Sequence, residues 1–182
     1  MLKYYGVLLL AAFMALSACE EADNSEALLI GEWLNSSQFS FYRQEDVARV
    51  PDGMPLRMVY DGQYDLKSDR TYTSNGTLTI VVKHNQAAVP IVYTYNENGS
   101  WYVDDGMFFQ TAHKLIMTPM DDRNQALVQE SDILQAIINP PMYELSSMEI
   151  IALSSSSAQL KVNSNSGSVM TLTRAQSLDP VQ

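Results

Sequence analysis

The chain has 182 residues, of which 46% are hydrophobic and 18% charged, with Gly 8, Pro 7 and Cys 1. This ordinary globular composition excludes a collagen, a disordered acidic tail and a long coiled coil. A single Cys excludes an internal disulfide and a Cys-rich structural zinc site. Lys and Arg total 11 against 21 Asp and Glu, so the net charge is −10. An acidic chain without a basic cluster binds nucleic acid poorly, so no nucleic-acid partner is predicted.

The N-terminus has the features of a bacterial lipoprotein signal. Lys3 supplies a positive charge, and the uncharged apolar run from Tyr4 to Leu16 is shorter than the ~20 residues of a membrane-spanning helix. The run ends in Leu16-Ser17-Ala18-Cys19, which resembles a lipobox, where a small residue precedes the Cys that becomes lipidated. We therefore predict a membrane anchor at Cys19, whose acyl chains hold the protein to the bilayer. The alternative is an ordinary signal peptide that a Cys happens to follow.

The residues after this Cys predict where the protein resides. Glu20 stands where an inner-membrane retention signal typically has Asp, so the predicted location is the outer membrane, facing the periplasm. We divide the chain into a signal peptide at 1–18, a lipidated acidic tether at 19–27, a barrel domain at 28–175 and a C-terminal tail at 176–182.

Strand patterns dominate the predicted domain. Tyr72, Leu78, Ile80 and Val82 share one parity while threonines hold the other, so one face of this strand is apolar. The alternation recurs in further segments, at 28–34, 56–66, 89–95, 101–103, 107–110 with 115–118, 148–153, 158–162 and 169–174. Eight or nine strands joined by short turns predict an antiparallel barrel or a sandwich.

Three Gly-containing dipeptides lie within or between these predicted strands. Asn75-Gly76 predicts a bulge or a sharp bend within a strand. Asn98-Gly99 and Asp105-Gly106 are typical of tight turns and predict hairpins on either side of Trp101.

One helix is predicted near residues 123–138. Asp122-x-x-Gln125 fits a capping box, apolar residues follow at helical spacing, and Asn139-Pro140-Pro141 ends the pattern. We expect the apolar stripe to pack on the barrel, the alternative being an exposed face that binds a partner.

Two short motifs at opposite ends of the domain predict how the barrel closes. Gly31-Glu32-Trp33 stands near its start and Thr171-Leu172-Thr173-Arg174 near its end. A G-x-W on the first strand and a basic residue on the last resemble the lipocalin/calycin barrel, in which the Trp plugs one end and the Arg lies across its face. The resemblance implies that Gly31, Trp33 and Arg174 close the barrel, through a favourable pair of guanidinium and indole. The predicted fold class is mainly β, a lipocalin-like antiparallel barrel with one helix.

A narrower resemblance spans about residues 31–174. The G-x-W is followed by the segments at 72–80 and 96–103, the helix, Met148-Glu149-Ile150-Ile151 and the final T-x-T-R. This order resembles the periplasmic part of ToxS-type proteins, small partners of membrane-embedded transcription activators. The resemblance implies an accessory role toward another envelope protein. ToxS-type proteins carry an N-terminal transmembrane helix, whereas this chain carries a lipobox.

Catalytic and metal-binding patterns are missing from the sequence. The two histidines, His84 and His113, lack metal-ligand spacing, and no nucleophile elbow, P-loop or dinucleotide fingerprint occurs. We predict no cofactor, no metal and no enzymatic activity. The aromatic residues are the remaining signal, and those that share parity with, or flank, the apolar positions of their strands are the predicted ligand-binding residues, Tyr72, Tyr93, Tyr95 and Trp101. The sequence leaves open whether they line a cavity or fill a closed core.

The sequence thus predicts an envelope lipoprotein that acts by binding. The first hypothesis is an accessory protein to another envelope protein. The alternative is a carrier or scavenger of a small apolar ligand, and the third is an envelope hydrolase.

Overall fold

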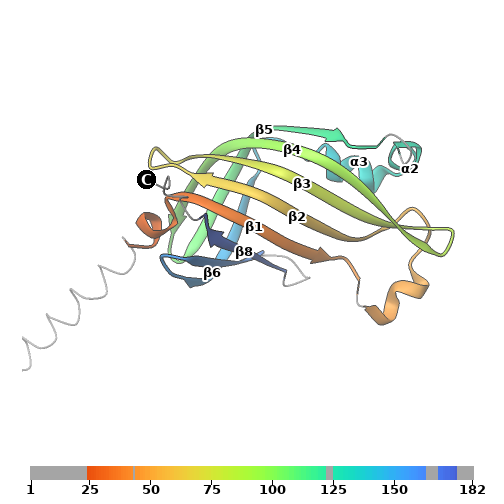
Figure 1. Cartoon of the computed structure of the whole chain (residues 1–182), viewed down its shortest axis with the longest axis horizontal. Coiled ribbons are helices and arrows are strands. Elements are labelled where there is room, and N and C mark those ends of the chain that lie inside the picture. Colours follow the sequence, from red (N-terminus) through yellow and green to blue (C-terminus); the bar gives the residue numbers. More distant parts are fainter. Residues whose placement is uncertain (1–23, 43, 122–124, 163–167, 176–182) are drawn as a thin grey trace, which may run out of the picture.

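Figure 1 shows the computed structural model, which describes residues 24–42, 44–121, 125–162 and 168–175. The predicted signal peptide, Cys19 and C-terminal tail lie outside the described residues, as does Asp122 of the predicted capping box. Within the described ranges, every helix is too short or too polar to span a bilayer.

Eight antiparallel strands form a closed barrel, in which each strand pairs with its neighbours in sequence and β8 returns to β1. The strands are β1 (Gly31–Ser40), β2 (Pro55–Leu66), β3 (Thr71–His84), β4 (Ala87–Asp104), β5 (Met107–Pro119), β6 (Leu145–Leu153), β7 (Ser157–Val162) and β8 (Val169–Arg174). The helical segments are residues 24–29, η1 (Gln44–Arg49), α2 (Gln125–Gln129) and α3 (Asp132–Ile138). The predicted fold class, a mainly β antiparallel barrel, is confirmed.

The barrel is long on one side and short on the other. β3, β4 and β5 have 14, 18 and 13 residues, whereas β7 and β8 have 6 each. β5 pairs with β6 only through Met107–Thr111, and β1 pairs with β8 only through Trp33–Asn35. The far halves of β1 and β5 therefore have no described strand on their other side.

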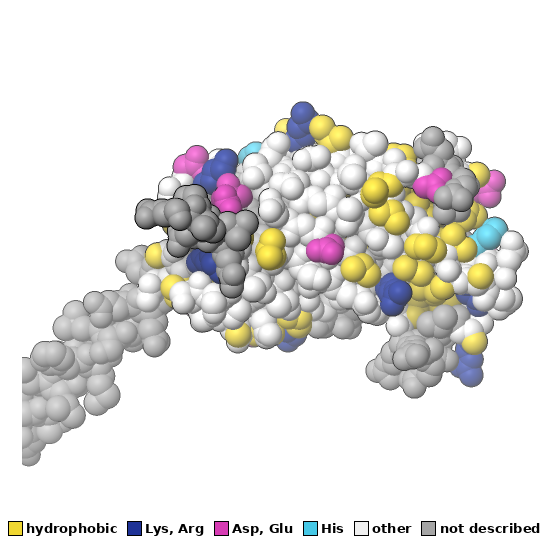
Figure 2. Space-filling view, in the orientation of Figure 1, with side chains coloured by type: hydrophobic (Ala, Val, Ile, Leu, Met, Phe, Trp, Pro, Cys, Tyr) yellow, Lys and Arg dark blue, Asp and Glu magenta, His cyan; other side chains and the backbone are white. Residues whose placement is uncertain are grey.

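The two ends of the barrel consequently differ. Residues 24–29 lie at the end where all eight strands meet, which we call the closed end, and the long strands extend away from it toward α2, α3 and η1 (Figure 1). We call this second end the wide end. Figure 2 shows hydrophobic side chains gathered at this end. Among the exposed hydrophobic residues of the protein are Phe41, directly after β1, Ile116 in β5 and Met120, directly after β5.

Inward-facing side chains form two separate hydrophobic clusters. The closed-end cluster contains Trp33, Trp101 and Phe108. The wide-end cluster contains Leu78, Ile80 and Tyr93 of the strands with Val128 and Leu134 of the short helices. Since Val128 and Leu134 are buried, the apolar stripe of the helical region packs on the barrel, as the sequence predicts.

The predicted break at Asn98-Gly99 is wrong. β4 runs unbroken through these residues, and the register with β5 shifts between Asn98 and Gly99, which identifies a β-bulge. A Cβ on Gly99 would lie 2.0 Å from the carbonyl oxygen of Thr111, so this Gly permits a close approach of two strands rather than a turn. The turn at Asp105-Gly106 is confirmed, with φ values of 47° and 72°.

Three other boundaries also differ from the predictions. The register through Gly76 is continuous, so no bulge interrupts β3 there. The first strand begins at Gly31 because residues 24–29 are helical. The predicted single helix is two short helices, since Ser131 begins a new one by accepting a hydrogen bond from the backbone N–H of Leu134 at 3.4 Å.

Candidate functional site: a cavity inside the barrel

The closed end is sealed where the first and last strands meet. The guanidinium carbon of Arg174 lies 3.8 Å from the centroid of the Trp33 ring. Arg174 Nη1 and Nη2 donate hydrogen bonds to the carbonyl oxygens of Ile30 and Leu28 at 2.8 and 2.7 Å. Trp33 Nε1 donates to the carbonyl oxygen of Leu29 at 2.7 Å. These contacts join β1, β8 and the segment before β1 at this end of the barrel.

Gly31 completes this arrangement because it has no side chain. Its φ is +127°, and a Cβ there would lie 2.4 Å from Nη1 of Arg174. The structure thus brings Gly31, Trp33 and Arg174 together at the point where the barrel closes.

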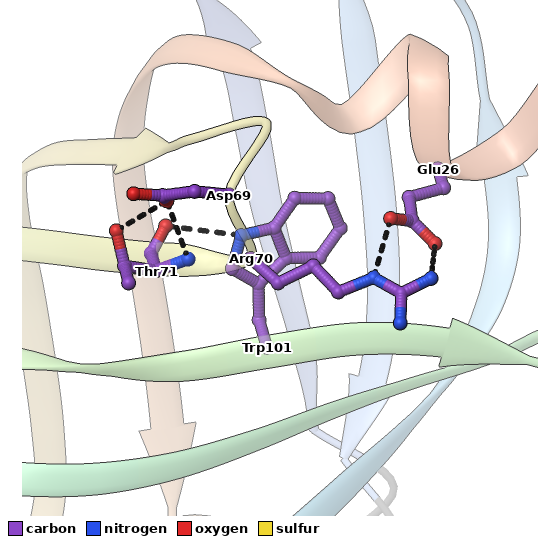
Figure 3. A network of polar contacts seen from close by, with 5 residues as sticks. All are labelled: Glu26, Asp69, Arg70, Thr71 and Trp101. Carbon is purple, nitrogen blue, oxygen red and sulfur yellow. Dashed lines mark hydrogen bonds and ion pairs between the residues drawn. The ribbon is translucent and has the colours of Figure 1, made fainter.

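A second set of contacts covers the same end (Figure 3). Arg70, in the turn between β2 and β3, forms an ion pair with Glu26 at 2.9 Å, and Asp69 accepts two hydrogen bonds from Thr71. Trp101 Nε1 donates to the carbonyl oxygen of Thr71 at 3.1 Å. Because the Arg70 side chain is 61% exposed, its ion pair contributes little to stability. Its effect is to hold residues 24–29 against the turn.

A cavity of about 290 Å³ lies inside the barrel, beyond the closed-end cluster. All eight strands contribute to its wall, through Asn35, Phe39, Met58, Tyr60, Tyr64, Ser74, Tyr95, Glu97, Gln110, Ser146, Met148, Val162 and Met170. An adjoining cavity of about 210 Å³ shares Met58, Tyr60, Tyr95 and Glu97 and extends to α3. The interior of the barrel is therefore hollow at this level rather than filled.

Two glycines explain why side chains do not fill this level. Gly62 and Gly76 occupy inward positions of the alternation on β2 and β3, and the two residues pair with each other. The backbones are in close contact, since a Cβ on Gly76 would lie 2.2 Å from the carbonyl oxygen of Asp61. With no side chain from either position, space remains between the two hydrophobic clusters.

Aromatic rings form one wall of the cavity. The Tyr60 ring contacts Phe39 and Tyr95 edge to face, with centroids 5.7 Å apart in each pair. The Tyr64 ring stacks on Tyr72 at 5.2 Å. Such packed rings present a rigid surface with apolar faces and polar hydroxyl groups.

Glu97 places a carboxylate in this mostly apolar wall. The Tyr72 hydroxyl donates a hydrogen bond to its Oε1. Burial raises the pKa of Glu97, and the Tyr72 hydrogen bond offsets part of this rise by favouring the charged form. Within the described part of the chain, the ion pairs join Arg70 to Glu26 and Lys161 to Glu149, and neither involves Glu97.

The other polar groups of the wall hold one another. The Tyr64 hydroxyl donates to Oε1 of Gln110 at 2.5 Å, and the hydroxyls of Ser74 and Tyr95 lie 3.1 Å apart. Burial, followed by the charge of Glu97, raises the pKa of the Tyr60 hydroxyl, so it stays neutral and protonated at neutral pH. The cavity therefore combines neutral hydroxyls with one carboxyl group.

The four predicted ligand-binding residues do not share one site. Tyr95 lines the cavity. Tyr72 and Trp101 are each 1% exposed and lie in the closed-end cluster, so their rings belong to the core, and only the Tyr72 hydroxyl reaches the cavity wall through Glu97. Tyr93 lines a different cavity of about 490 Å³, between β4, the last residues of β5 and the helices α2 and α3.

Tyr60, Tyr64 and Glu97 were not predicted from the sequence. Tyr60 and Tyr64 share the parity of Leu66, which is fully buried at the end of the same strand. Glu97 shares the parity of Tyr95. The alternation predicts that Glu97 faces inward only when β4 is treated as one continuous strand.

Metal-binding geometry is not found in the described ranges. No group of three or more His, Cys, Asp or Glu side chains there could hold a metal ion. His113 instead lies with its Nε2 3.2 Å from the Ser100 hydroxyl on the surface.

No family model matches this chain, and no curated protein matches it. Among solved structures, the chain is similar to a lipocalin-like protein from Bacteroides uniformis ATCC 8492, with 11% sequence identity and a TM-score of 0.39. The match covers 81% of this chain and 99% of the other. The barrel topology of the present chain follows from its own strand pairing.

Proposed function

We propose that this protein binds a small, largely apolar molecule inside the barrel and acts as a carrier or scavenger rather than as an enzyme. The supporting observation is the cavity of about 290 Å³, to which every strand contributes lining residues. Pockets for small molecules commonly measure ~300–1,000 Å³ and combine apolar walls with a few polar groups. The adjoining 210 Å³ brings the available space into this range.

The closure of the barrel supports this proposal. Arg174 and Trp33 seal one end, whereas the far halves of β1 and β5 flank the other. A ligand in the cavity would meet the closed-end cluster on one side and the wide-end cluster on the other. The Met residues of the wall, Met58, Met148 and Met170, have flexible side chains that adapt to differently shaped apolar ligands.

Binding by the isolated protein tests this function. Every strand pairs with its neighbours within residues 31–174, so a chain that begins at residue 20 retains the whole barrel. We expect this chain to bind the neutral apolar dye N-phenyl-1-naphthylamine saturably, at about micromolar strength or ~8 kcal/mol. Val162→Phe should weaken binding at least tenfold because Val162 lines the cavity. Fluorescence titration measures both.

The matched control is Ile151→Phe, which adds the same ring at a residue that is 44% exposed. This variant should bind the dye as the unaltered chain does. Absence of saturable binding, or equal loss in both variants, contradicts a ligand site inside the barrel.

An accessory role toward another envelope protein is our second proposal, supported by the strand edges of the wide end. Residues 38–40 of β1 and 115–119 of β5 pair with no described strand on one side. Such edges can pair with a strand from another chain. In this case the isolated protein should bind the dye weakly and gain affinity when its partner is added.

We also propose that the protein is a lipoprotein anchored through Cys19 to the outer membrane, facing the periplasm. The support is the charged N-terminus, the short apolar run and the small residues before the single Cys.

Cys19→Ser tests the anchor. Lipid transfer requires the thiol, so the variant should take up no labelled palmitate and should accumulate as an unprocessed precursor. Metabolic labelling of cells that express either chain measures this. Normal processing of the variant, with no label in the unaltered chain, contradicts the anchor.

A further inference from the structure

We propose that the barrel cavity selects ligands that carry a protonated amine on an apolar body, with Glu97 as the partner of the ammonium group. This inference rests on the proposed function and specifies its ligand class.

The position of Glu97 provides the first argument. Its side chain lines both the 290 Å³ and the 210 Å³ cavities, and it is the only Asp, Glu, Lys or Arg among their described lining residues. It comes from the middle of β4, opposite Ser74 on β3. A ligand that occupies either space therefore meets this carboxylate.

The second argument is that little in the structure compensates the charge of the Glu97 carboxylate. Glu97 is half-buried, and a carboxylate partly withdrawn from water is unfavourable unless a positive charge or several hydrogen bonds compensate it. The described contacts give it the Tyr72 hydroxyl, while burial raises its pKa. An ammonium group would supply the missing positive charge and up to three N–H donors.

The surrounding rings provide the third argument. Tyr60, Tyr64 and Tyr95 line the same cavity as Glu97, and an aromatic ring attracts a cation within ~6 Å of its face. Their hydroxyl oxygens can accept hydrogen bonds from an ammonium group. Phe39 and Met148 line the same space and would contact the apolar body of the ligand.

The same carboxylate disfavours anionic ligands. A fatty acid or a bile acid would bring a second negative charge into a space without a described Lys or Arg. Like charges at short range in a protein interior repel strongly. The cavity is therefore expected to discriminate by charge among molecules with the same apolar body.

Three probes with one skeleton test this inference: 4-phenylbutylamine, 4-phenylbutanol and 4-phenylbutyrate. We expect the chain from residue 20 to bind the amine at least tenfold more tightly than the alcohol, and the carboxylate most weakly. Glu97→Gln should remove the preference for the amine over the alcohol, because Gln carries no charge, preserves size and can still accept from Tyr72. Titration calorimetry at neutral pH gives the three affinities for each protein.

The folded state of the variant is checked by its urea midpoint. Since the carboxylate is desolvated in the folded barrel, Glu97→Gln is expected to keep or raise this midpoint. Equal affinities for amine and alcohol in the unaltered chain, or an amine preference that survives in Glu97→Gln, overturn the inference. If all three probes and the neutral dye fail to bind, the proposed function fails as well, whereas dye binding without an amine preference removes only the inference.

Lowering the pH provides an independent readout. The described titratable groups that face Glu97 are the hydroxyls of Tyr60, Tyr64, Tyr72 and Tyr95, whose pKa values burial raises, so they do not change charge in acid. The amine preference should fall as pH drops through the raised pKa of Glu97, while alcohol affinity stays constant. A preference that does not change with pH between 7 and about 4 contradicts the role of this carboxyl group.

Discussion

Replacing Trp33 with Ala is expected to lower the free energy of unfolding by about 3–5 kcal/mol, the usual cost of removing a large buried aromatic side chain. Trp33 is fully buried in the closed-end cluster. Its removal leaves a void, breaks the hydrogen bond to Leu29 and takes away the surface on which Arg174 lies. Urea unfolding followed by circular dichroism measures the loss.

A double-mutant cycle then tests the contact itself. Arg174→Ala should cost about 2 kcal/mol, because the guanidinium lies over Trp33 and donates to backbone carbonyls. The two changes should be non-additive by about 0.5–3 kcal/mol, as is usual for residues in contact. Arg174→Lys is the matched control, since it keeps the charge and loses the planar, branched donors. Additive losses contradict a shared closure contact.

The second large effect is expected for Gly76→Ala, with a loss of about 3 kcal/mol. The added Cβ would lie 2.2 Å from the carbonyl oxygen of Asp61 and 2.5 Å from Cα of Gly62. These are backbone atoms and cannot rotate away, so β2 and β3 must separate. Because the pair lies beside the cavity, dye binding should also weaken. Urea unfolding and the dye titration measure the two effects.

Gly106→Ala separates steric contact from backbone conformation. Gly106 has a φ of +72°, and a Cβ there would meet no atom within 4 Å. This change should cost only about 1 kcal/mol, the strain of an L-residue in the left-handed region. If Gly76→Ala costs no more than Gly106→Ala, the close approach of β2 and β3 does not determine the stability of this region.

The barrel could be predicted from sequence because its signals are local. Strand alternation places Tyr72, Leu78 and Ile80 on one face whatever the rest of the chain does. The G-x-W and the terminal Arg identify the first and last strands, which the structure places side by side. The division of the helical region into α2 and α3 was missed because the Ser131 cap lies within an otherwise continuous apolar pattern.

The cavity could not be predicted in the same way. Its space depends on Gly62 lying opposite Gly76, a pairing between distant residues that only the register of β2 and β3 defines. Glu97 was missed because Asn98-Gly99 has the composition of a hairpin turn, although it lies within β4, opposite a bulge at His113 of β5. The dipeptide Asn-Gly is compatible both with a hairpin turn and with a continuous strand, and only the pairing with β5 shows which of the two forms here.

The location of residues 24–29 at the closed end has a consequence for how a ligand would be exchanged (Figure 1). With Cys19 lipidated as proposed, four residues lie between Cys19 and Asn24, and the two are at most about 18 Å apart. The sealed end then faces the bilayer, and the wide end lies about 60 Å away along the 18 residues of β4. A molecule would load and leave through the aqueous compartment rather than by lateral diffusion from the lipid. The anchor then holds the protein in place without supplying the ligand. The supply of ligand to the cavity is limited by the solubility of the ligand in water or by a second protein that delivers it.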